Sequence, residues 1–448
     1  MSLDFLFSTF AKNLSADAIV WRDEIWSYRR LAERVDHWRC RIDQEAIGCG
    51  RVVILRGDFS PESISLLLAF LQCGSIVAPL TERAAVHADD LARLAEAEAM
   101  ARVDSEDRVE IERLPYKATH PLYDVLRRSR SSGLLLFSSG STGEPKAVLH
   151  DAGKLLAKFR APGRRLRTLL FLGFDHIGGL DTLFYALSNA GVVVAVDGRS
   201  PQAVCRAIER HRVEVLSVAP SFLNQLILSE AHRTYDLSSL QYITYGAEVM
   251  PESTLRKIAQ LFPGVALLQK YGTTEVGAPR SRSRGRESLW LKMDGEGFAT
   301  RVVDGMLEIK ADSAMLGYLN APSPFTVDGW FVTGDAVERD GEYLKILGRA
   351  TDLINIGGEK VYPAEVESVI QELEEVAEAS VFGERNVILG SIVCAKIRLG
   401  KAVADRSEFI ARVKKYCGER LAAYKVPRKV VLTDETQVTE RFKKARGE

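Results

Sequence analysis

Short apolar strands alternate with helices over most of the first 280 residues of this 448-residue chain. The strands are mostly apolar, and segments with helical spacing lie between them. Buried strands of this kind form parallel sheets whose two faces are covered by helices. The pattern therefore predicts an α/β fold. The defining strands are predicted at 51–55, 191–196, 213–218, 241–245 and 265–268, with helices at 61–72, 202–211 and 251–261.

The pattern changes after residue 288. Short strands are predicted within 289–310 and 330–347, and Asp-Gly pairs border or break them. Asp-Gly is a hairpin signal, because both residues tolerate the positive φ of tight turns. We therefore expect an antiparallel section that closes a large domain. The four pairs are Asp294-Gly295, Asp304-Gly305, Asp328-Gly329 and Asp340-Gly341.

A smaller α+β unit follows Gly348-Arg349, and its length of about a hundred residues is typical of a domain. Its predicted elements are a helix at 364–373, a strand at 391–399 and a helix at 407–420. The chain is thus predicted to divide into a large N-terminal domain, 1–348, and a small mobile C-terminal domain, 349–448. The boundary is predicted within 348–352.

The charges balance, with 60 Lys and Arg residues against 60 Asp and Glu residues. That balance argues against general electrostatic binding to nucleic acid or to anionic membranes. The six cysteines show neither C-x-x-C pairs nor zinc-ligand spacing, which is typical of a reducing cytoplasm. The longest apolar stretch, 64–80, is too short and too mixed to span a bilayer, and no signal peptide is evident. We expect a cytoplasmic protein without membrane insertion.

The strongest local motif is a strand that runs into a loop rich in Gly and Ser, within 134–146. Glycines let backbone N–H groups approach phosphate oxygens, and hydroxyls and a lysine add donors and charge. The spacing differs from that of a Walker loop, which argues against a kinase or a P-loop NTPase. The predicted phosphate-binding residues are Ser138, Ser139, Gly140, Ser141, Thr142, Gly143 and Lys146.

This loop resembles the signature of the adenylate-forming, or AMP-binding, enzymes, which include acyl-CoA synthetases, peptide-synthetase adenylation domains and luciferases. Further motifs follow in the order of that family over nearly the whole chain. Several motifs in order are far more specific than any one of them. They are Ser27–Leu31, Tyr271–Glu275, Gly317-Tyr318, Gly329–Asp335, Gly348-Arg349, Gly357–Glu367 and Tyr424–Pro427.

The resemblance implies a two-step reaction. A carboxylic acid and ATP give an acyl-adenylate and pyrophosphate, and the acyl group then passes to a thiol. The first choice of acceptor is CoA, and the alternative is the phosphopantetheine of an acyl, aryl or peptidyl carrier protein. A non-catalytic nucleotide-binding protein is a third reading. The implied cofactors are ATP, Mg²⁺ and CoA or carrier-protein phosphopantetheine.

The resemblance also implies roles for the residues around the nucleotide. The loop from Ser138 to Lys146 would hold the β- and γ-phosphates. Thr274 would donate its hydroxyl to the α-phosphate, and Glu275 would hold Mg²⁺. Asp335 would accept both ribose hydroxyls, and Arg349 would add a ribose or phosphate contact. The nucleotide would also contact Tyr271, Gly272 and Thr273. The adenine ring and the floor of the acyl pocket would be lined by Gly246, Ala247 and Glu248.

Lys443 is the residue that the resemblance assigns to adenylation. The chain ends in Thr439–Arg446, and matching those two residues to the family motif places Lys443 on the family's lysine. A lysine there would bridge the substrate carboxylate and the α-phosphate as a mobile charge. Because Arg441 and Phe442 depart from the motif, Lys444 stays the alternative.

Three further residues are expected near the acyl pocket. His176 would gate it, in the segment Phe174–Gly179. Asp175 would bind an α-amino group if the substrate is an amino acid. Lys270 is unusual at its position and could pair with Asp175 or with a polar group of the substrate; a solvent-facing lysine is the alternative. Gly246 and Gly272 would line the same pocket. Charged residues there argue against a plain long-chain fatty acid.

Two other features carry hypotheses. Thr351 and Asp352 stand where the family has the hinge on which the small domain rotates. Four arginines fall within Arg280–Arg286. They form either a solvated loop or a patch that binds an acidic carrier protein or the phosphates of CoA.

Overall fold

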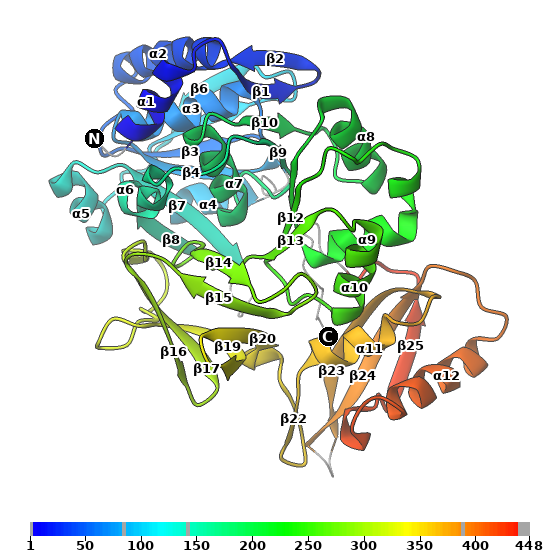
Figure 1. Cartoon of the computed structure of the whole chain (residues 1–448). Coiled ribbons are helices and arrows are strands. Elements are labelled where there is room, and N and C mark those ends of the chain that lie inside the picture. Colours follow the sequence, from blue (N-terminus) through cyan, green and yellow to red (C-terminus); the bar gives the residue numbers. More distant parts are fainter. Residues whose placement is uncertain (1–2, 83–86, 140–143, 387–389, 438–448) are drawn as a thin grey trace.

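The computed structural model of the chain describes residues 3–82, 87–139, 144–386 and 390–437. Its large domain contains two seven-stranded sheets (Figure 1). In the first sheet every neighbouring pair is parallel except the edge pair β1 and β2. Its order is β13 (Ala266–Gln269), β12 (Tyr242–Tyr245), β11 (Val215–Val218), β9 (Arg167–Leu170), β10 (Val192–Ala195), β1 (Asp17–Trp21) and β2 (Glu24–Ser27).

The second sheet is parallel at its centre and antiparallel at both edges. Strands β7, β4, β3 and β5 run parallel, whereas β18, β8 and β6 are antiparallel to their neighbours. Its order is β18 (Gly317–Tyr318), β8 (Pro145–Asp151), β7 (Gly133–Ser139), β4 (Ile76–Leu80), β3 (Val52–Arg56), β5 (Ala99–Val103) and β6 (Val109–Arg113). The predicted parallel-rich α/β fold is confirmed.

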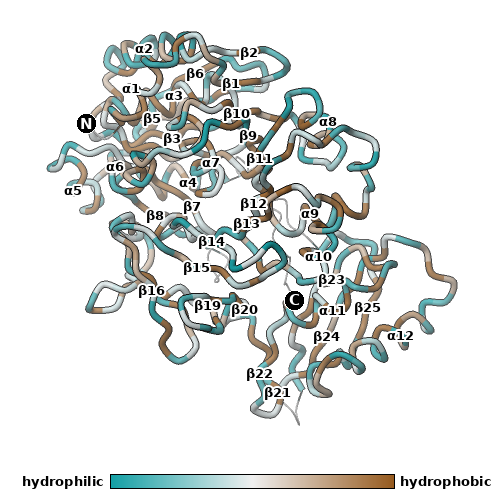
Figure 2. Tube along the Cα trace, in the orientation of Figure 1, coloured by the Kyte–Doolittle hydropathy of each residue, from teal (hydrophilic) through white to brown (hydrophobic). Residues whose placement is uncertain are grey.

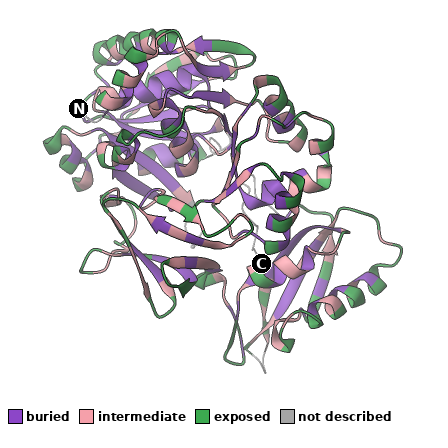
Figure 3. Cartoon of the chain, viewed as in Figure 1, coloured by how far each residue is buried: buried purple, intermediate pink, exposed green. Residues whose placement is uncertain are grey.

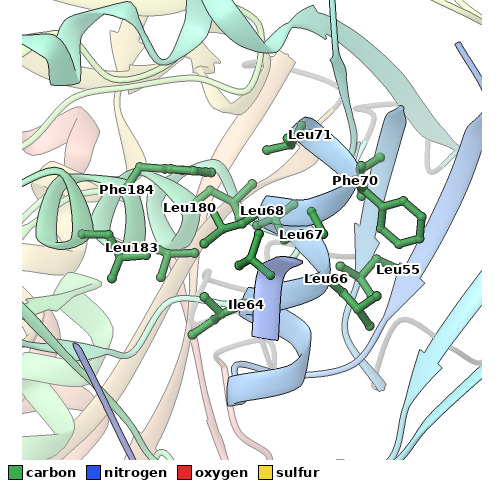
Figure 4. Packing of buried hydrophobic residues seen from close by; sticks show 14 of the residues in the cluster. Leu55, Ile64, Leu66, Leu67, Leu68, Phe70, Leu71, Leu180, Leu183 and Phe184 are labelled. Carbon is green, nitrogen blue, oxygen red and sulfur yellow. The ribbon is translucent and has the colours of Figure 1, made fainter. Parts of the chain in front are cut away.

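The main core lies where helix α3 (Pro61–Gln72) meets both sheets and helix α7 (Ile177–Ser188). Ser60 caps the N-terminus of α3, and Pro61 occupies its first turn, which is the favoured arrangement at a helix start. A helix that is apolar all round must be covered on every side. Helix α3 is buried almost throughout (Figure 3), and its leucines pack against Leu180, Leu183 and Phe184 of α7 (Figure 4).

The remaining helices of the large domain cover the outer faces of the sheets. Helix α2 (Tyr28–Gln44) shows the expected pattern, with buried residues at helical spacing on one side and mostly polar residues elsewhere (Figure 2). The others are α1 (Asp4–Lys12), α4 (Ala88–Leu94), α5 (Pro121–Ser129), α6 (Ala152–Leu155), α8 (Pro201–His211), α9 (Pro220–Ser229) and α10 (Glu252–Leu261), with short 3-10 turns η2 (Ala157–Arg160) and η3 (Ala231–Arg233). In the described part of the chain, no helix has the length and apolarity needed to cross a membrane.

A six-stranded antiparallel sheet follows, as predicted. Its order is β14 (Arg280–Ser283), β15 (Trp290–Asp294), β20 (Tyr343–Arg349), β19 (Phe331–Asp340), β17 (Met306–Ala311) and β16 (Phe298–Val303). Two of the four Asp-Gly pairs lie in hairpin turns. Asp304 and Gly305 have φ of 51° and 77° in the two-residue turn between β16 and β17. The pair at 340–341 joins β19 to β20.

The hairpin expectation is wrong for Asp294-Gly295, whereas Asp328-Gly329 lies in a tight reversal across which Phe325 and Phe331 form an antiparallel bridge. Gly295 follows β15, but the next strand, β16, pairs only with β17 at the far edge of the sheet. Gly329 lies in a tight turn closed by Thr326 and Trp330, just before β19. Asp-Gly favours a tight reversal, and the partner of the following strand is decided by the rest of the sheet.

The last part of the chain has a hydrophobic core of its own, which runs from Ile354 to Val430. The predicted boundary at 348–352 lies just before the first residue of this core. A turn η4 (Ala350–Asp352) leads into the hairpin of β21 (Ile354–Ile356) and β22 (Glu359–Val361), and a three-stranded sheet with two helices follows. These elements are α11 (Pro363–Ile370), β23 (Val376–Asn386), β24 (Gly390–Leu399), α12 (Arg406–Gly418), η5 (Ala423–Lys425) and β25 (Lys429–Thr433).

The small domain docks on helices α9 and α10 of the large domain. The Asn224 side chain donates a hydrogen bond of 2.6 Å to the carbonyl of Ala377. The hydroxyl of Ser368 accepts from the backbone N–H of Glu252, and the carbonyl of Ser368 accepts from the hydroxyl of Ser253. These few polar contacts are the kind that separate without unfolding either domain.

One half-buried acid beside α3 predicts a pH-dependent stability. Both oxygens of Asp107 accept from the N–H of Glu62, yet burial raises the pKa of Asp107 to about 6. The folded protein therefore keeps a proton that the unfolded chain loses above about pH 4, so stability falls as the pH rises from 4 to 6. We expect Asp107→Asn to raise the free energy of unfolding at pH 7 by about 1–2 kcal/mol and to flatten that decline. Denaturant unfolding at several pH values measures both; a wild-type curve without the decline would contradict the assignment.

Candidate active site

The motif Tyr271–Glu275 begins two residues beyond Gln269, the last residue of β13, beside the carboxyl end of β12. Ligands bind at the carboxyl ends of strands in open parallel sheets. The two strand ends approach closely, because the N–H of Lys270 donates to the carbonyl of Tyr245 at 2.7 Å. A Cβ on Gly246 would lie 2.7 Å from the carbonyl oxygen of Lys270, so only glycine fits there. The predicted nucleotide segments at 246–248 and 271–275 are therefore neighbours.

Asp335 is held between the nucleotide motif and the domain junction. The Tyr271 hydroxyl donates to its Oδ2 at 2.6 Å, and Nε of Arg349 lies 2.8 Å from its Oδ1. Arg349 also donates to the carbonyl of Thr333 at 3.1 Å. Burial raises the pKa of Asp335, and Arg349 and Tyr271 oppose that rise. Each carboxylate oxygen keeps a second lone pair, so Asp335 is oriented yet still able to accept from a ligand.

Lys146 and Glu275 approach the same aromatic side chain. The Tyr318 hydroxyl donates to Oε1 of Glu275 at 2.9 Å, and Nζ of Lys146 lies 5.2 Å from the centre of the Tyr318 ring. That distance is within the range of a cation–π contact. Tyr318 thereby links the lysine of the phosphate loop to the acid of the second motif. Sequence reasoning had noted Tyr318 only as part of a family motif.

The backbones of Thr273 and Thr274 are fixed by hydrogen bonds. Thr273 and Gly277 exchange hydrogen bonds through their backbones, and Nε2 of His150 donates to the carbonyl of Thr274 at 2.6 Å. The buried hydroxyl of Thr273 has no hydrogen-bond partner in the described part of the chain. Such a hydroxyl is costly unless a ligand satisfies it. Burial lowers the pKa of His150, so it is a neutral donor.

The phosphate loop is described only at its ends. Strands β7 and β8 are antiparallel and place Ser138 opposite Lys146, so the two described ends of the phosphate loop are neighbours. Ser139 lies at the end of β7. The predicted loop residues Gly140, Ser141, Thr142 and Gly143 lie outside the described residues, as do Lys443 and Lys444 with the rest of the motif 439–446.

Among the predicted residues after β12, Glu248 forms its contacts at the interface between the two domains. Ala247 has a positive φ of 69°, which turns the chain sharply after Gly246. Glu248 accepts hydrogen bonds from the backbone N–H and the hydroxyl of Ser221. With Ser221 and Gln437, Glu248 lines a small cavity between the two domains. Its carboxylate is thus directed to the interdomain contact.

The acyl-pocket candidates are only partly brought together. His176 caps the N-terminus of α7, where its Nδ1 accepts from the N–H of Gly178 at 3.0 Å. Asp175 is buried and accepts from the hydroxyl of Thr81 at 3.4 Å. The suggested pairing of Asp175 with Lys270 stays a prediction. The acid that acts on the Lys270 ammonium is Asp181, because α7 carries Asp181 toward it and directs Asp175 to Thr81.

Most of the arginine-rich segment is used within the fold. Arg282 pairs with Asp294, Arg284 pairs with Asp340, and Arg286 donates to backbone carbonyls at the end of α10 and beyond. The first part of the segment, Arg280–Ser283, forms β14, and the rest is a turn. At the predicted hinge, Thr351 and Asp352 lie in the turn η4 between the antiparallel sheet and the small domain.

Family models agree with this architecture. A model described as AMP-binding enzyme matches residues 6–294, and one described as AMP-binding enzyme C-terminal domain matches residues 365–443. The first match alone covers more than half of the chain, so the chain belongs to the AMP-binding enzyme family. The resemblance inferred from the motifs is confirmed.

Two similar curated proteins match over most of their length. The indoleacetate–CoA ligase of Aromatoleum aromaticum is 28% identical over 473 aligned positions, which cover 93% of this chain and 91% of that protein. The 2-succinylbenzoate–CoA ligase of Enterococcus faecalis is 25% identical and covers 92% of this chain and 91% of its own length.

Solved structures share the fold. The anthranilate CoA ligase AuaEII, in complex with anthranoyl-AMP, has a TM-score of 0.84 and 19% identity, over 99% of this chain and 95% of that one. The o-succinylbenzoate CoA synthetase of Bacillus subtilis, in complex with an acyl-adenylate intermediate, has a TM-score of 0.78 and 22% identity, over 99% and 96%.

Proposed function

We propose that this chain is an ATP-dependent acid–CoA ligase, which forms an acyl-adenylate and then an acyl thioester. Its relatives named above are acid–CoA ligases that match along nearly the whole chain. One observation carries the proposal. Three distant segments meet at Asp335, where Tyr271 of the nucleotide motif and Arg349 of the domain junction hold a buried carboxylate. A carboxylate so oriented suits the two hydroxyls of a ribose.

The first step brings one anion to the α-phosphorus of a polyanion, so positioning and charge stabilisation dominate its barrier. In our proposal Lys146 supplies positive charge to the β- and γ-phosphates. Asp335 fixes the ribose, and the hydroxyls of Thr273 and Thr274 meet the nucleotide beside β13. Lys443 bridges the substrate carboxylate and the α-phosphate, and rotation about Thr351 and Asp352 then opens the site to the thiol.

Glu275 fits a role in holding Mg²⁺. Its carboxylate supplies the oxygen donor that Mg²⁺ prefers, and the hydrogen bond from Tyr318 fixes its orientation. Among the described residues, no group of three or more His, Cys, Asp or Glu side chains could hold a metal without help. Glu275 would therefore hold the ion together with phosphate oxygens, and the ion would neutralise phosphate charge.

We propose CoA as the acceptor rather than a carrier protein. The relatives named above are CoA ligases, which supports this choice. The arginine-rich segment could serve either acceptor, and Arg282, Arg284 and Arg286 are engaged within the chain. We also propose a cytoplasmic location, which is supported by six cysteines that are all free thiols.

Product analysis tests the acceptor. The protein is incubated with ATP, Mg²⁺, a panel of carboxylic acids and either CoA or a phosphopantetheinylated carrier protein. We expect AMP and an acid-dependent acyl-CoA by mass spectrometry. An acylated carrier without any acyl-CoA would contradict the choice of CoA and leave the adenylation step standing.

A further inference from the structure

One face of strand β8 carries both the lysine of the phosphate loop and a buried histidine. Side chains alternate along a strand, so Lys146, Val148 and His150 lie on the same face. Tyr318 of β18 pairs in register with Val148 and therefore lies on this face as well. Two side chains of this face, those of Tyr318 and His150, bind the second nucleotide motif.

The motif is fixed through its backbone carbonyls, because the carbonyl oxygens of residues 273–277 all accept hydrogen bonds. The first and the last accept from N–H groups of this same segment, and the third and the fourth accept from residues 313–315. The second, that of Thr274, accepts from Nε2 of His150 at 2.6 Å. A carbonyl can only accept, so Nε2 carries the proton. At Thr274 the motif is thus attached to the neighbouring sheet by a side chain.

His150 is a rigid point of attachment. It has no exposed surface, and its strand is hydrogen-bonded on both sides, to β7 and to β18. A side chain packed in this way has little freedom to move. Thr274 and the adjacent Glu275 are the residues proposed to meet the α-phosphate and Mg²⁺. A displacement of about 1 Å in groups that align a reaction can cost a factor of about 10² in rate.

We propose that His150 is a positioning residue for acyl-adenylate formation. By holding the Thr274 carbonyl, it keeps the Thr274 hydroxyl and the Glu275 carboxylate in a fixed position relative to Lys146, which lies four residues earlier on the same face of β8. One strand thereby aligns the group for the β- and γ-phosphates with the groups for the α-phosphate and the metal. This inference rests on the proposed function and adds a residue to its first step.

Three replacements of His150 test the inference. The amide nitrogen of His150→Gln reaches the Thr274 carbonyl, that of His150→Asn is one methylene too short, and His150→Leu has no donor. We expect kcat for ATP–pyrophosphate exchange to fall by about 10–100-fold in His150→Leu and His150→Asn, and to return close to the wild-type value in His150→Gln. All three should retain thioester formation from a supplied acyl-adenylate, because no triphosphate has to be aligned in that step.

A second readout does not depend on turnover. In calorimetric titration, MgATP should bind about tenfold more weakly to His150→Leu than to the wild type, and His150→Gln should bind it as the wild type does. The control is Val35→Ala, which opens a cavity under helix α2. It should lower the unfolding temperature and leave exchange and MgATP binding as they are.

Several outcomes would overturn the inference and leave the ligase standing. They are unchanged exchange in His150→Leu, an equal loss in both half-reactions, no recovery in a folded His150→Gln, and the same loss in Val35→Ala. If His150→Leu does not fold, the comparison of His150→Gln with His150→Asn decides, because both are polar and only the first reaches Thr274. A wild type that catalyses no exchange with any acid would overturn the proposed function as well.

Discussion

Lys443→Ala is expected to abolish acid-dependent ATP–pyrophosphate exchange while it spares thioester formation from a supplied acyl-adenylate. Lys443 is proposed to bridge the substrate carboxylate and the α-phosphate as these two anions approach each other. The second step, thioester formation, does not bring these two anions together again. Loss of one such stabilising group typically costs a factor of about 10²–10³ in rate. The two half-reactions are measured separately, with purified acyl-adenylate as the substrate of the second.

The matched control is Lys444→Ala. The two lysines are neighbours with the same charge, so a general effect of the basic tail would weaken both variants alike. We expect Lys444→Ala to keep exchange within a few-fold of the wild type. Loss in Lys444→Ala and retention in Lys443→Ala would reassign the lysine. If both variants keep both half-reactions, neither Lys443 nor Lys444 takes part in catalysis, and the proposed role is contradicted.

Asp335→Ala is expected to lower kcat/KM for ATP by at least about 100-fold, because hydrogen bonds to a charged group are worth about 1.5–3 kcal/mol each and two ribose hydroxyls would lose theirs. The fold should survive the change. Arg349 is 54% exposed and still donates to the carbonyl of Thr333, so its charge is not stranded in the interior. Steady-state kinetics with varied ATP measures the loss, and thermal unfolding checks the fold.

Tyr271→Phe is the graded control for that experiment. It removes one hydrogen bond to Asp335 and keeps the ring in the core, so a loss of about tenfold is expected. If Asp335→Ala and Tyr271→Phe are equally mild, and both proteins are folded, Asp335 is a structural acid and the ribose is bound elsewhere.

The sequence predicted the elements whose signals are local. The helix predicted at 61–72 is observed as α3, with Pro61 in its first turn. Strands β3, β10, β11, β12 and β13 and helices α8 and α10 were predicted from apolar periodicity. The motif residues Tyr271, Asp335 and Arg349 were identified separately, and the structure brings them into one hydrogen-bonded chain.

The contacts between side chains of distant segments could not be predicted from the sequence. Strand β23 was not predicted, although its partner β24 directly follows it in the chain. His150 reads as a lone histidine on a strand, and only the fold carries it to the carbonyl of Thr274. The pairing of Lys158 with Asp181 joins a 3-10 turn to a helix, and no spacing rule relates them. Side-chain partners across elements are set by packing, which periodicity does not encode.

Acid-dependent ATP–pyrophosphate exchange in the absence of CoA is the most direct test of the central claim. It reports acyl-adenylate formation alone, before any acceptor is involved. The assay covers short and long fatty acids, aryl acids, α- and β-amino acids and diacids. We predict exchange that requires Mg²⁺ and one class of acid. A protein that binds ATP and catalyses no exchange with any of these acids would contradict the assignment and would be a nucleotide-binding protein without adenylation chemistry.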